Sequence, residues 1–235
     1  MQAYFQALFA SKDWQTFLDV LPTIPYATWE TFYSTLVSTV LALVIGLPLG
    51  VSLVVGEKGI RPMPRWLMGL LNTIINLLRS IPFLILMIIV IPLSRLILGT
   101  SIGTMAAIVP LVIASFPFVS RLVETSLREV DNGVIEAAQS MGATPMQIIF
   151  KVLIPESLPS LISNATIAAT TILGYGAMAG VIGGGGLGQI AINYGYYRYN
   201  VVLELFATAL LVVLVQVFQG IGTRLALRSD KRLRK

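Results

Sequence analysis

The sequence predicts an all-α integral membrane protein with five transmembrane helices and a helical loop on the cytoplasmic side. Of its 235 residues, 56% are hydrophobic and only 11% are charged, whereas about a quarter of the residues in a typical soluble domain are charged. Long apolar runs recur along the chain, and each approaches or exceeds the ~20 residues that a helix needs to cross a bilayer. These observations favour a polytopic membrane protein over a soluble one.

The apolar runs define the predicted organisation of the chain. Residues 1–28 are apolar at roughly helical spacing but too interrupted to span, so we expect an external segment lying in the membrane interface, ended by Pro22 and Pro25. Residues 29–228 form the transmembrane domain, with spans at about 31–55, 66–98, 102–119, 158–182 and 201–223. Pro82 and Pro92 are expected to kink the long second span. A basic cytoplasmic tail, residues 229–235, closes the chain.

Basic residues predict the orientation of these spans. Twelve of the 16 Lys and Arg residues fall in the loop after the first span, in the loop between the third and fourth spans, or after the fifth span. Loops rich in Lys and Arg stay in the cytoplasm. The pattern therefore places the N-terminus outside and the C-terminus in the cytoplasm.

The loop at about 124–157 has the local chemistry of two short helices. Asp131 is suited to cap the first helix, and Gly142 is suited to the left-handed position just past its end. Thr144 is suited to cap the second helix, because Gln147 three residues later completes a capping box. Pro155 is expected to end that second helix.

The same loop resembles a known sequence element. Glu136-Ala137-Ala138, followed after three residues by Gly142 and after nine more by Val152-x-Ile154-Pro155, is similar to the EAA loop of ABC importer permeases. In that family the loop is the coupling helix that docks on the separate ATP-hydrolysing subunit. The resemblance implies that coupling to the ATPase rests on Glu136, Ala137, Ala138, Gly142, Ala143, Thr144, Pro145 and Pro155.

Further segments resemble the methionine-uptake group of these permeases; they are residues 79–83, 99–103, 141–148, 174–178 and 185–190. This resemblance implies an ABC type I importer permease fold in the bacterial inner membrane, assembled as a homodimer. It implies two ATPase subunits, which bind ATP and Mg, and an extracytoplasmic substrate-binding lipoprotein. L- and D-methionine would be the substrates, and this chain would itself be neither an enzyme nor a cofactor-binding protein. A permease for another small solute, such as an osmoprotectant, is the alternative.

A polar stripe recurs every three or four residues along the second span and therefore lies on one helix face. It consists of Arg65, Gly69, Asn72, Asn76 and Arg79. Arg79 lies deep in an apolar segment, where an unpaired charge is costly. The stripe either packs helices together through hydrogen bonds or lines a pathway.

The fourth span carries a second stripe of this kind, made of Ser160, Asn164, Ala168, Thr171, Tyr175 and Met178. Together with Arg79, we assign Asn164, Thr171, Tyr175 and Met178 to the translocation path, with ordinary helix packing as the alternative. Ile172 is assigned to the lipid-facing side of the same helix.

A glycine run follows the fourth span and includes Gly183, Gly184, Gly185, Gly186 and Gly188. It lacks the Gly-Lys-Ser/Thr ending of a phosphate-binding loop. The run predicts either a flexible outer loop or a gate or docking element for a binding protein.

Composition excludes several other classes of function. The chain has no Cys and no His, so disulfides and thiol chemistry are excluded, no metal site is expected, and the commonest general base is missing. Its basic residues flank apolar spans, which argues against a nucleic-acid partner. A secondary transporter would carry paired repeats and ion-coupling carboxylates at mid-membrane, and Glu204 is the only candidate for such a carboxylate.

Overall fold

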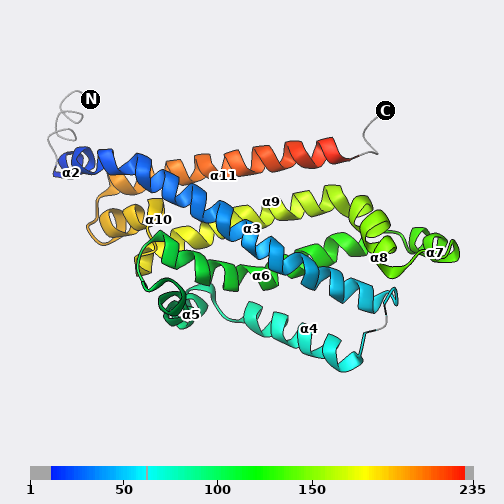
Figure 1. The fold of residues 1–235 in the computed structure, drawn as a ribbon. Coiled ribbons are helices and arrows are strands. Elements are labelled where there is room, and N and C mark those ends of the chain that lie inside the picture. Colours follow the sequence, from blue (N-terminus) through cyan, green and yellow to red (C-terminus); the bar gives the residue numbers. More distant parts are fainter. Residues whose placement is uncertain (1–11, 62, 231–235) are drawn as a thin grey trace. The chain divides into compact units, whose positions relative to one another are not determined.

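A computed structural model describes residues 12–61 and 63–230 of the chain. In this part every regular element is helical (Figure 1), which confirms the predicted all-α class. The α-helices are α2 (Lys12–Val20), α3 (Ile24–Glu57), α4 (Arg65–Ser80), α5 (Phe83–Leu98), α6 (Thr104–Arg128), α7 (Asn132–Ser140), α8 (Pro145–Ile148), α9 (Ile154–Ala179), α10 (Gly186–Ile190) and α11 (Val201–Ser229). Short 3-10 turns occupy Leu21–Thr23 and Gly180–Ile182, and π-helical turns occupy Ile149–Leu153 and Ala191–Tyr196.

Four helical stretches are long and apolar enough to cross a membrane, and they run over Lys12–Glu57, Thr104–Arg128, Pro145–Ile182 and Val201–Ser229. A fifth candidate is the pair α4 and α5, which together pass the same test but are bent by 108° at their junction. Helix α11 leaves most of its apolar side chains exposed, as expected where lipid replaces water as the solvent.

The kink expected at Pro82 is a complete break between α4 and α5 (Figure 1). Ile81 adopts extended backbone angles there, with φ −81° and ψ 128°. The residue before a proline is sterically disfavoured from the helical region, so the helix ends one residue early. Pro92, by contrast, lies inside α5, and the helix continues through it.

The expectation that Pro22 and Pro25 end the N-terminal segment is wrong. Pro22 lies in the 3-10 turn Leu21–Thr23, and Pro25 is the second residue of α3. Proline is tolerated in the first turn of a helix, where its missing N–H has no partner in any case. Helix therefore continues almost without interruption from α2 into α3. Residues 1–11 and 231–235, which hold the start of the interfacial segment and most of the basic tail, lie outside the described residues.

The chain divides into two compact units. The first comprises Met1–Ser38, Met87–Leu111 and Thr171–Val217. Its core brings α2 and the start of α3 against α10 and α11, through Phe17, Val20, Ile24, Ala27, Leu187, Ile190, Leu203 and Ala207. Asn200 supports this packing, because its side-chain amide donates to the Asp13 carbonyl at 2.9 Å and its oxygen accepts from Leu203 N–H at 3.0 Å. Helix α2 is therefore anchored to the rest of this unit.

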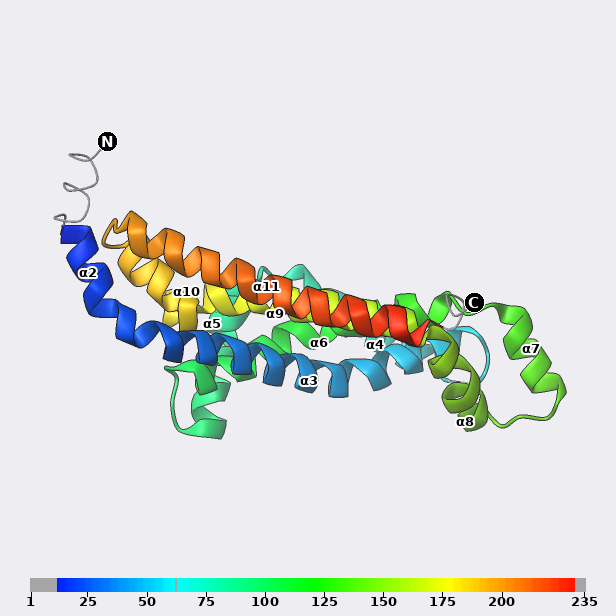
Figure 2. The same cartoon turned by 90° about the horizontal axis from the view of Figure 1, so that it is seen from above.

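The second unit comprises Thr39–Leu86, Val112–Thr170 and Phe218–Lys235. Here α3 packs closely on α6, because two glycines one turn apart leave room for the neighbouring helix. A Cβ atom on Gly50 would lie 2.7 Å from the Ser120 carbonyl oxygen and 2.7 Å from a Val123 methyl group. Figure 2 shows α7 and α8, which also belong to this unit, as a helical hairpin projecting beyond the end of α6.

We predict that Gly50→Ala lowers the stability of the protein by about 1–3 kcal/mol, because the added methyl group would overlap backbone atoms that cannot move aside. Thermal unfolding in detergent measures the effect. Gly69→Ala is the matched control, since Gly69 also lies within a helix but has nothing within 4 Å of the added atom. Equal melting temperatures for the two variants would contradict the close packing of α3 on α6.

Candidate functional site

The loop singled out by the sequence begins with a capped helix. The Asp131 carboxylate accepts a hydrogen bond from Gly133 N–H at 2.6 Å, as its predicted capping role requires. At the other end of α7, Ala143 N–H donates to the Ala138 carbonyl at 3.1 Å, and Gly142 N–H donates to the Gln139 carbonyl at 2.9 Å. This pair of bonds is the Schellman arrangement, which needs a left-handed residue. Gly142 supplies it with φ +77°.

The second helix of the loop begins with the predicted capping box. Thr144 Oγ1 accepts from Gln147 N–H at 3.4 Å, and Gln147 Oε1 accepts from Thr144 N–H at 2.8 Å. Pro145 occupies the first helical position, where a proline is favoured.

Pro155 does not end this second helix, in contrast to the prediction. The chain passes from α8 through the π-helical turn Ile149–Leu153 directly into α9, and Pro155 is the second residue of α9. Such π turns inside helices are frequent at functional sites. The second half of the loop is therefore continuous with the helix that carries the fourth predicted span.

The loop divides its side chains between an inner face and an exposed one. Ile135, Ala138, Ile148 and Ile149 are buried and hold the two short helices together. Val134, Met141, Met146 and Phe150 are exposed, Met141 to 81% of its surface. Exposed apolar side chains gathered on one small element are typical of a docking surface.

Glu136 is exposed on α7 and makes no hydrogen bond or ion pair with any of the described residues. It is thus available to a partner and has no role in holding its own loop. Ala137, beside it, is also exposed, whereas Ala138 packs inward. The three residues of the Glu-Ala-Ala motif therefore divide into two outward-facing positions and one that packs within the loop.

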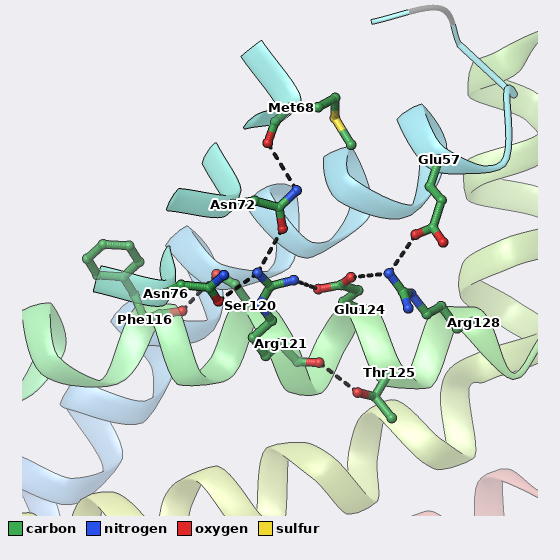
Figure 3. A network of polar contacts seen from close by, with 10 residues as sticks. All are labelled: Glu57, Met68, Asn72, Asn76, Phe116, Ser120, Arg121, Glu124, Thr125 and Arg128. Carbon is green, nitrogen blue, oxygen red and sulfur yellow. Dashed lines mark hydrogen bonds and ion pairs between the residues drawn. The ribbon is translucent and has the colours of Figure 1, made fainter. Parts of the chain in front are cut away.

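A charge network lies on the last two turns of α6, which continues through the first residues of the predicted loop range 124–157 and ends before α7 (Figure 3). The Glu124 carboxylate, only 6% exposed, accepts from Arg121 and from Arg128, each at 2.6 Å. Arg121 also donates to the side-chain oxygens of Asn72 at 2.7 Å and of Asn76 at 2.9 Å, both on α4. Arg128 also pairs with Glu57, at the end of α3, at 2.6 Å. One buried carboxylate thus organises contacts to two other helices.

The link between the end of α3 and the start of the loop is reinforced by Lys58, whose ammonium donates to the Val130 carbonyl at 2.8 Å. Burial lowers the pKa of Lys58, an effect opposed by the nearby Glu57 and Asp131 carboxylates. The short segment after α3 is therefore held against the residues that begin the loop.

In each of the two predicted stripes, some residues pack against a neighbouring helix and others are exposed. On α4, Asn72 and Asn76 pack against α6 through Arg121, while Arg79 is exposed. On α9, the Asn164 amide donates to Ser126 Oγ at 2.7 Å and to the Leu122 carbonyl at 3.2 Å. These parts of the stripes are helix-packing contacts, which was the alternative interpretation.

Farther along α9 the side chains differ in exposure. Ala168 is fully buried, Thr171 and Tyr175 are half-buried, and Met178 is 48% exposed. The assignment of Ile172 to the lipid-facing side is wrong, because none of its surface is exposed. Ile167, at 50% exposure, is an outward-facing apolar residue of this helix.

The glycine run is tied into its unit by hydrogen bonds. Gly186 N–H donates to the Glu30 carboxylate at 3.0 Å, and Leu187 N–H donates to Thr31 Oγ1 at 2.9 Å. Gly183 accepts from Gly103 N–H at 2.9 Å, and Gly185 N–H donates to Gln189 Oε1 at 2.8 Å. These contacts to α3 and to the start of α6 argue against a freely flexible loop.

The family model of the binding-protein-dependent transport system inner membrane component matches residues 42–235, a range that contains both short helices of the loop. The chain belongs to this family. It is therefore a permease subunit of a multi-pass inner-membrane transport system, and it is not the subunit that hydrolyses ATP.

Individual members of this permease family are similar to the chain over most of its length. The probable D-methionine transport system permease protein MetI of Vibrio cholerae is 49% identical over 208 residues, which cover 88% of this chain and 92% of the relative. The methionine import system permease protein MetP of Bacillus subtilis is 48% identical over 206 residues, 88% of this chain and 93% of the relative.

Solved structures agree with the family assignment. A structure of the MetNI methionine ABC transporter in an inward-facing conformation includes a chain that is 45% identical, with a TM-score of 0.86, covering 91% of this chain and 99% of that one. An amino acid ABC transporter solved with histidines is 21% identical with a TM-score of 0.69 and shares the fold. The predicted fold and permease family are thus confirmed.

We predict that Arg121→Ala detaches α4 from α6 and lowers stability by about 2–3 kcal/mol, the range for hydrogen bonds that involve a charged group. A double-mutant cycle with Asn72→Ala, followed by thermal unfolding in detergent, should give a coupling of about 0.5–3 kcal/mol. Arg95→Ala is the control, because the exposed Arg95 side chain makes no hydrogen bond or ion pair within residues 12–61 and 63–230. Strictly additive effects of Arg121→Ala and Asn72→Ala would contradict the network.

Proposed function

We propose that this chain is the permease subunit of an ATP-driven importer that carries methionine, in its L and D forms, across the inner membrane. The observation that carries the proposal is the match, over 88% of the chain at 48–49% identity, to relatives named for D-methionine or methionine transport. The similarity to the MetNI methionine transporter at 45% identity supports it further.

The proposed assembly has two copies of this chain, two ATPase subunits and an extracytoplasmic substrate-binding lipoprotein. The ATPase docks on the exposed face of α7 and α8. That face offers Met141, Met146 and Phe150 as apolar contacts and Glu136 as a charged group without a partner in its own loop. Apolar contacts at the centre with polar groups at the rim are typical of subunit interfaces.

We propose that the glycine run, with Gly183, Gly184, Gly185, Gly186 and Gly188, is a docking element for the binding protein. Its bonds to Glu30 and Thr31 favour a preformed surface over a hinged gate, because a preformed surface loses less entropy on binding.

Reconstitution tests the proposal. The permease and its ATPase are placed in proteoliposomes with the binding protein and radiolabelled L-methionine, and uptake is measured with ATP, without ATP and without the ATPase. We expect uptake only in the complete system, reduced by unlabelled D-methionine and unaffected by glycine betaine. Competition by glycine betaine alone would assign the chain to an osmoprotectant importer.

If the loop couples the permease to the ATPase, substitutions in it should reduce uptake or ATPase association in the reconstituted system. Gly142→Val should abolish coupling, since a β-branched residue at φ +77° is strongly disfavoured, whereas Gly142→Asn should retain most activity because Asn tolerates this conformation. Glu136→Ala should reduce ATPase association by about tenfold or more, the loss expected for one hydrogen bond to a charged group.

Glu129→Ala, at an exposed carboxylate between α6 and α7, is the control for Glu136→Ala and should leave ATPase association unchanged. Co-purification of the ATPase and ATP hydrolysis per methionine transported provide the two readouts. Normal association and normal coupling in both Glu136→Ala and Gly142→Val would remove this loop from the mechanism.

We infer that the N-terminus is external and the C-terminus cytoplasmic, because the basic loops favour the cytoplasmic side. The Cys-free chain allows a direct test with the single substitutions Ala3→Cys and Leu233→Cys. A membrane-impermeant thiol reagent added to intact cells should label position 3 and not position 233. Labelling with the reverse preference would invert the topology.

We propose that the translocation path follows the face of α9 that carries Thr171, Tyr175 and Met178. Met178→Trp should block uptake by narrowing the path, while dimer assembly and ATPase binding persist. Ile167→Trp, at a similarly exposed position on the same helix, is the control and should transport normally. A blocked Ile167→Trp with an active Met178→Trp would place the path on another face of α9.

A further inference from the structure

A cavity of about 370 Å³ lies in the second unit between α4 and α6, and no residue of α7 or α8 lines it. Three arginines line it, Arg79, Arg121 and Arg128, with Glu124 as its one carboxylate. The remaining lining residues are Phe118, Leu122 and Thr125. Small-molecule sites have volumes of about 300–1,000 Å³ and combine apolar walls with a few placed polar groups, and this cavity falls within that description.

The charges in the cavity are not balanced. Arg121 directs its two terminal nitrogens to Glu124 and to the two asparagines of α4 (Figure 3). Arg128 uses one terminal nitrogen for both Glu124 and Glu57. The side chain of Arg79 has no hydrogen bond or ion pair to any residue in the described parts of the chain. A free guanidinium therefore faces a cavity in which the only carboxylate is already shared by two others.

The position of Arg79 along α4 makes an unpaired charge energetically costly. It lies 14 residues after Arg65 on α4, which corresponds to about 21 Å along the helix axis. Arg79 sits in one of the candidate membrane-spanning stretches, and an unpaired charge at such a depth is costly unless it faces water or a ligand. The cavity provides that alternative surface for Arg79.

The neighbouring network gives the cavity a fixed wall. Arg121 is held from both sides, by Glu124 on its own helix and by Asn72 and Asn76 across the gap. Arg121 therefore gives the cavity a wall that is already ordered before an anion binds beside it, which lowers the entropy cost of binding on that side.

We propose that this cavity binds the carboxylate of the transported amino acid, with Arg79 as the group that pairs with it. The proposal rests on the proposed function for its ligand. A guanidinium binds a carboxylate through two parallel N–H···O bonds, which fixes both position and orientation. Phe118 and Leu122 offer apolar surface to the side chain of the same ligand. The phosphate of an anionic lipid shares this chemistry, and the experiment distinguishes the two sources.

The electrostatic part of the test uses a single cysteine at the cavity wall. Thr125 lines the cavity, is exposed, and donates only to the Arg121 carbonyl of its own helix, so Thr125→Cys reports on the local potential. Labelling rates with an anionic sulfonate thiosulfonate reagent and with its cationic trimethylammonium counterpart are compared in the assembled transporter. The anionic-to-cationic ratio should fall by about tenfold or more when Arg79→Gln is added.

Arg79→Lys should largely preserve this ratio, and Arg95→Gln, an equal change of charge on α5, should leave it unaltered. A ratio that does not respond to Arg79→Gln would overturn the anion site.

The ligand part of the test keeps Arg79 intact, so it does not depend on the folding of the arginine variants. The Thr125→Cys protein is labelled with a neutral reagent in phosphatidylcholine nanodiscs. L-methionine should slow the reaction, whereas methionine amide, which lacks the carboxylate, should not. Equal protection by the amide, or protection by added phosphatidylglycerol without protection by methionine, would overturn the assignment to the amino-acid carboxylate.

Uptake by the parent complex separates this inference from the proposed function. Failure of the parent to take up methionine would overturn the proposed substrate and the identity of this ligand together. Absence of methionine protection in a complex that does take up methionine would overturn the cavity site alone.

Discussion

The ion pairs of the Glu124 carboxylate are the interactions on which the contacts among α3, α4 and α6 depend. The carboxylate is almost fully buried between Arg121 and Arg128, and a buried carboxylate without such partners would be strongly destabilising. Through Arg121 it fixes the otherwise exposed helix α4, and through Arg128 it fixes the end of α3. Asp131, the N-cap of α7, lies three residues after Arg128, so the base of the proposed coupling loop is held at the point where these contacts converge.

The same network links the loop proposed to dock on the ATPase with the helix α4 that carries Arg79. Arg121 and Glu124 connect the helix that carries Arg79 to the end of α6, from which the chain enters the loop that would receive force from an ATPase. Among the side chains of α4, Ile75 alone is buried. Directional hydrogen bonds from Arg121 to Asn72 and Asn76 fix the position of α4 on α6, and elements held by such bonds are suited to switching between discrete states.

Local chemistry accounts for what the sequence could predict. Asp131, Gly142 and Thr144 were assigned from patterns that span at most a few residues, and each has its predicted geometry. The network was not predicted, although Arg121, Glu124 and Arg128 recur at the three- and four-residue spacing of a helical ion-pair ladder. Its partners Asn72 and Asn76 lie 49 and 45 residues away in the sequence, and no local rule gives such a pairing. The prediction that Ile172 faces lipid was wrong for a related reason. In a helix that is apolar on nearly all sides, the sequence does not indicate which face is covered by other helices. The expected stop at Pro155 failed because a proline in the first turn of a helix is compatible with continuation.

The π-helical turn Ile149–Leu153 determines how α9 is rotated about its own axis relative to the loop. Its closing bond runs from Ile154 N–H to the Ile149 carbonyl, so the turn contains one residue more than an α-helical turn would. Each residue of an α-helix advances by about 100° around the axis. The extra residue therefore turns every later side chain of α9, including Ser160 and Asn164, by that amount relative to the loop. If the turn relaxed to regular α-helix, the face of α9 presented to Ser126 would change while the coupling loop stayed in place. The conformation of the π-helical turn therefore determines which side of α9 packs against the neighbouring helices.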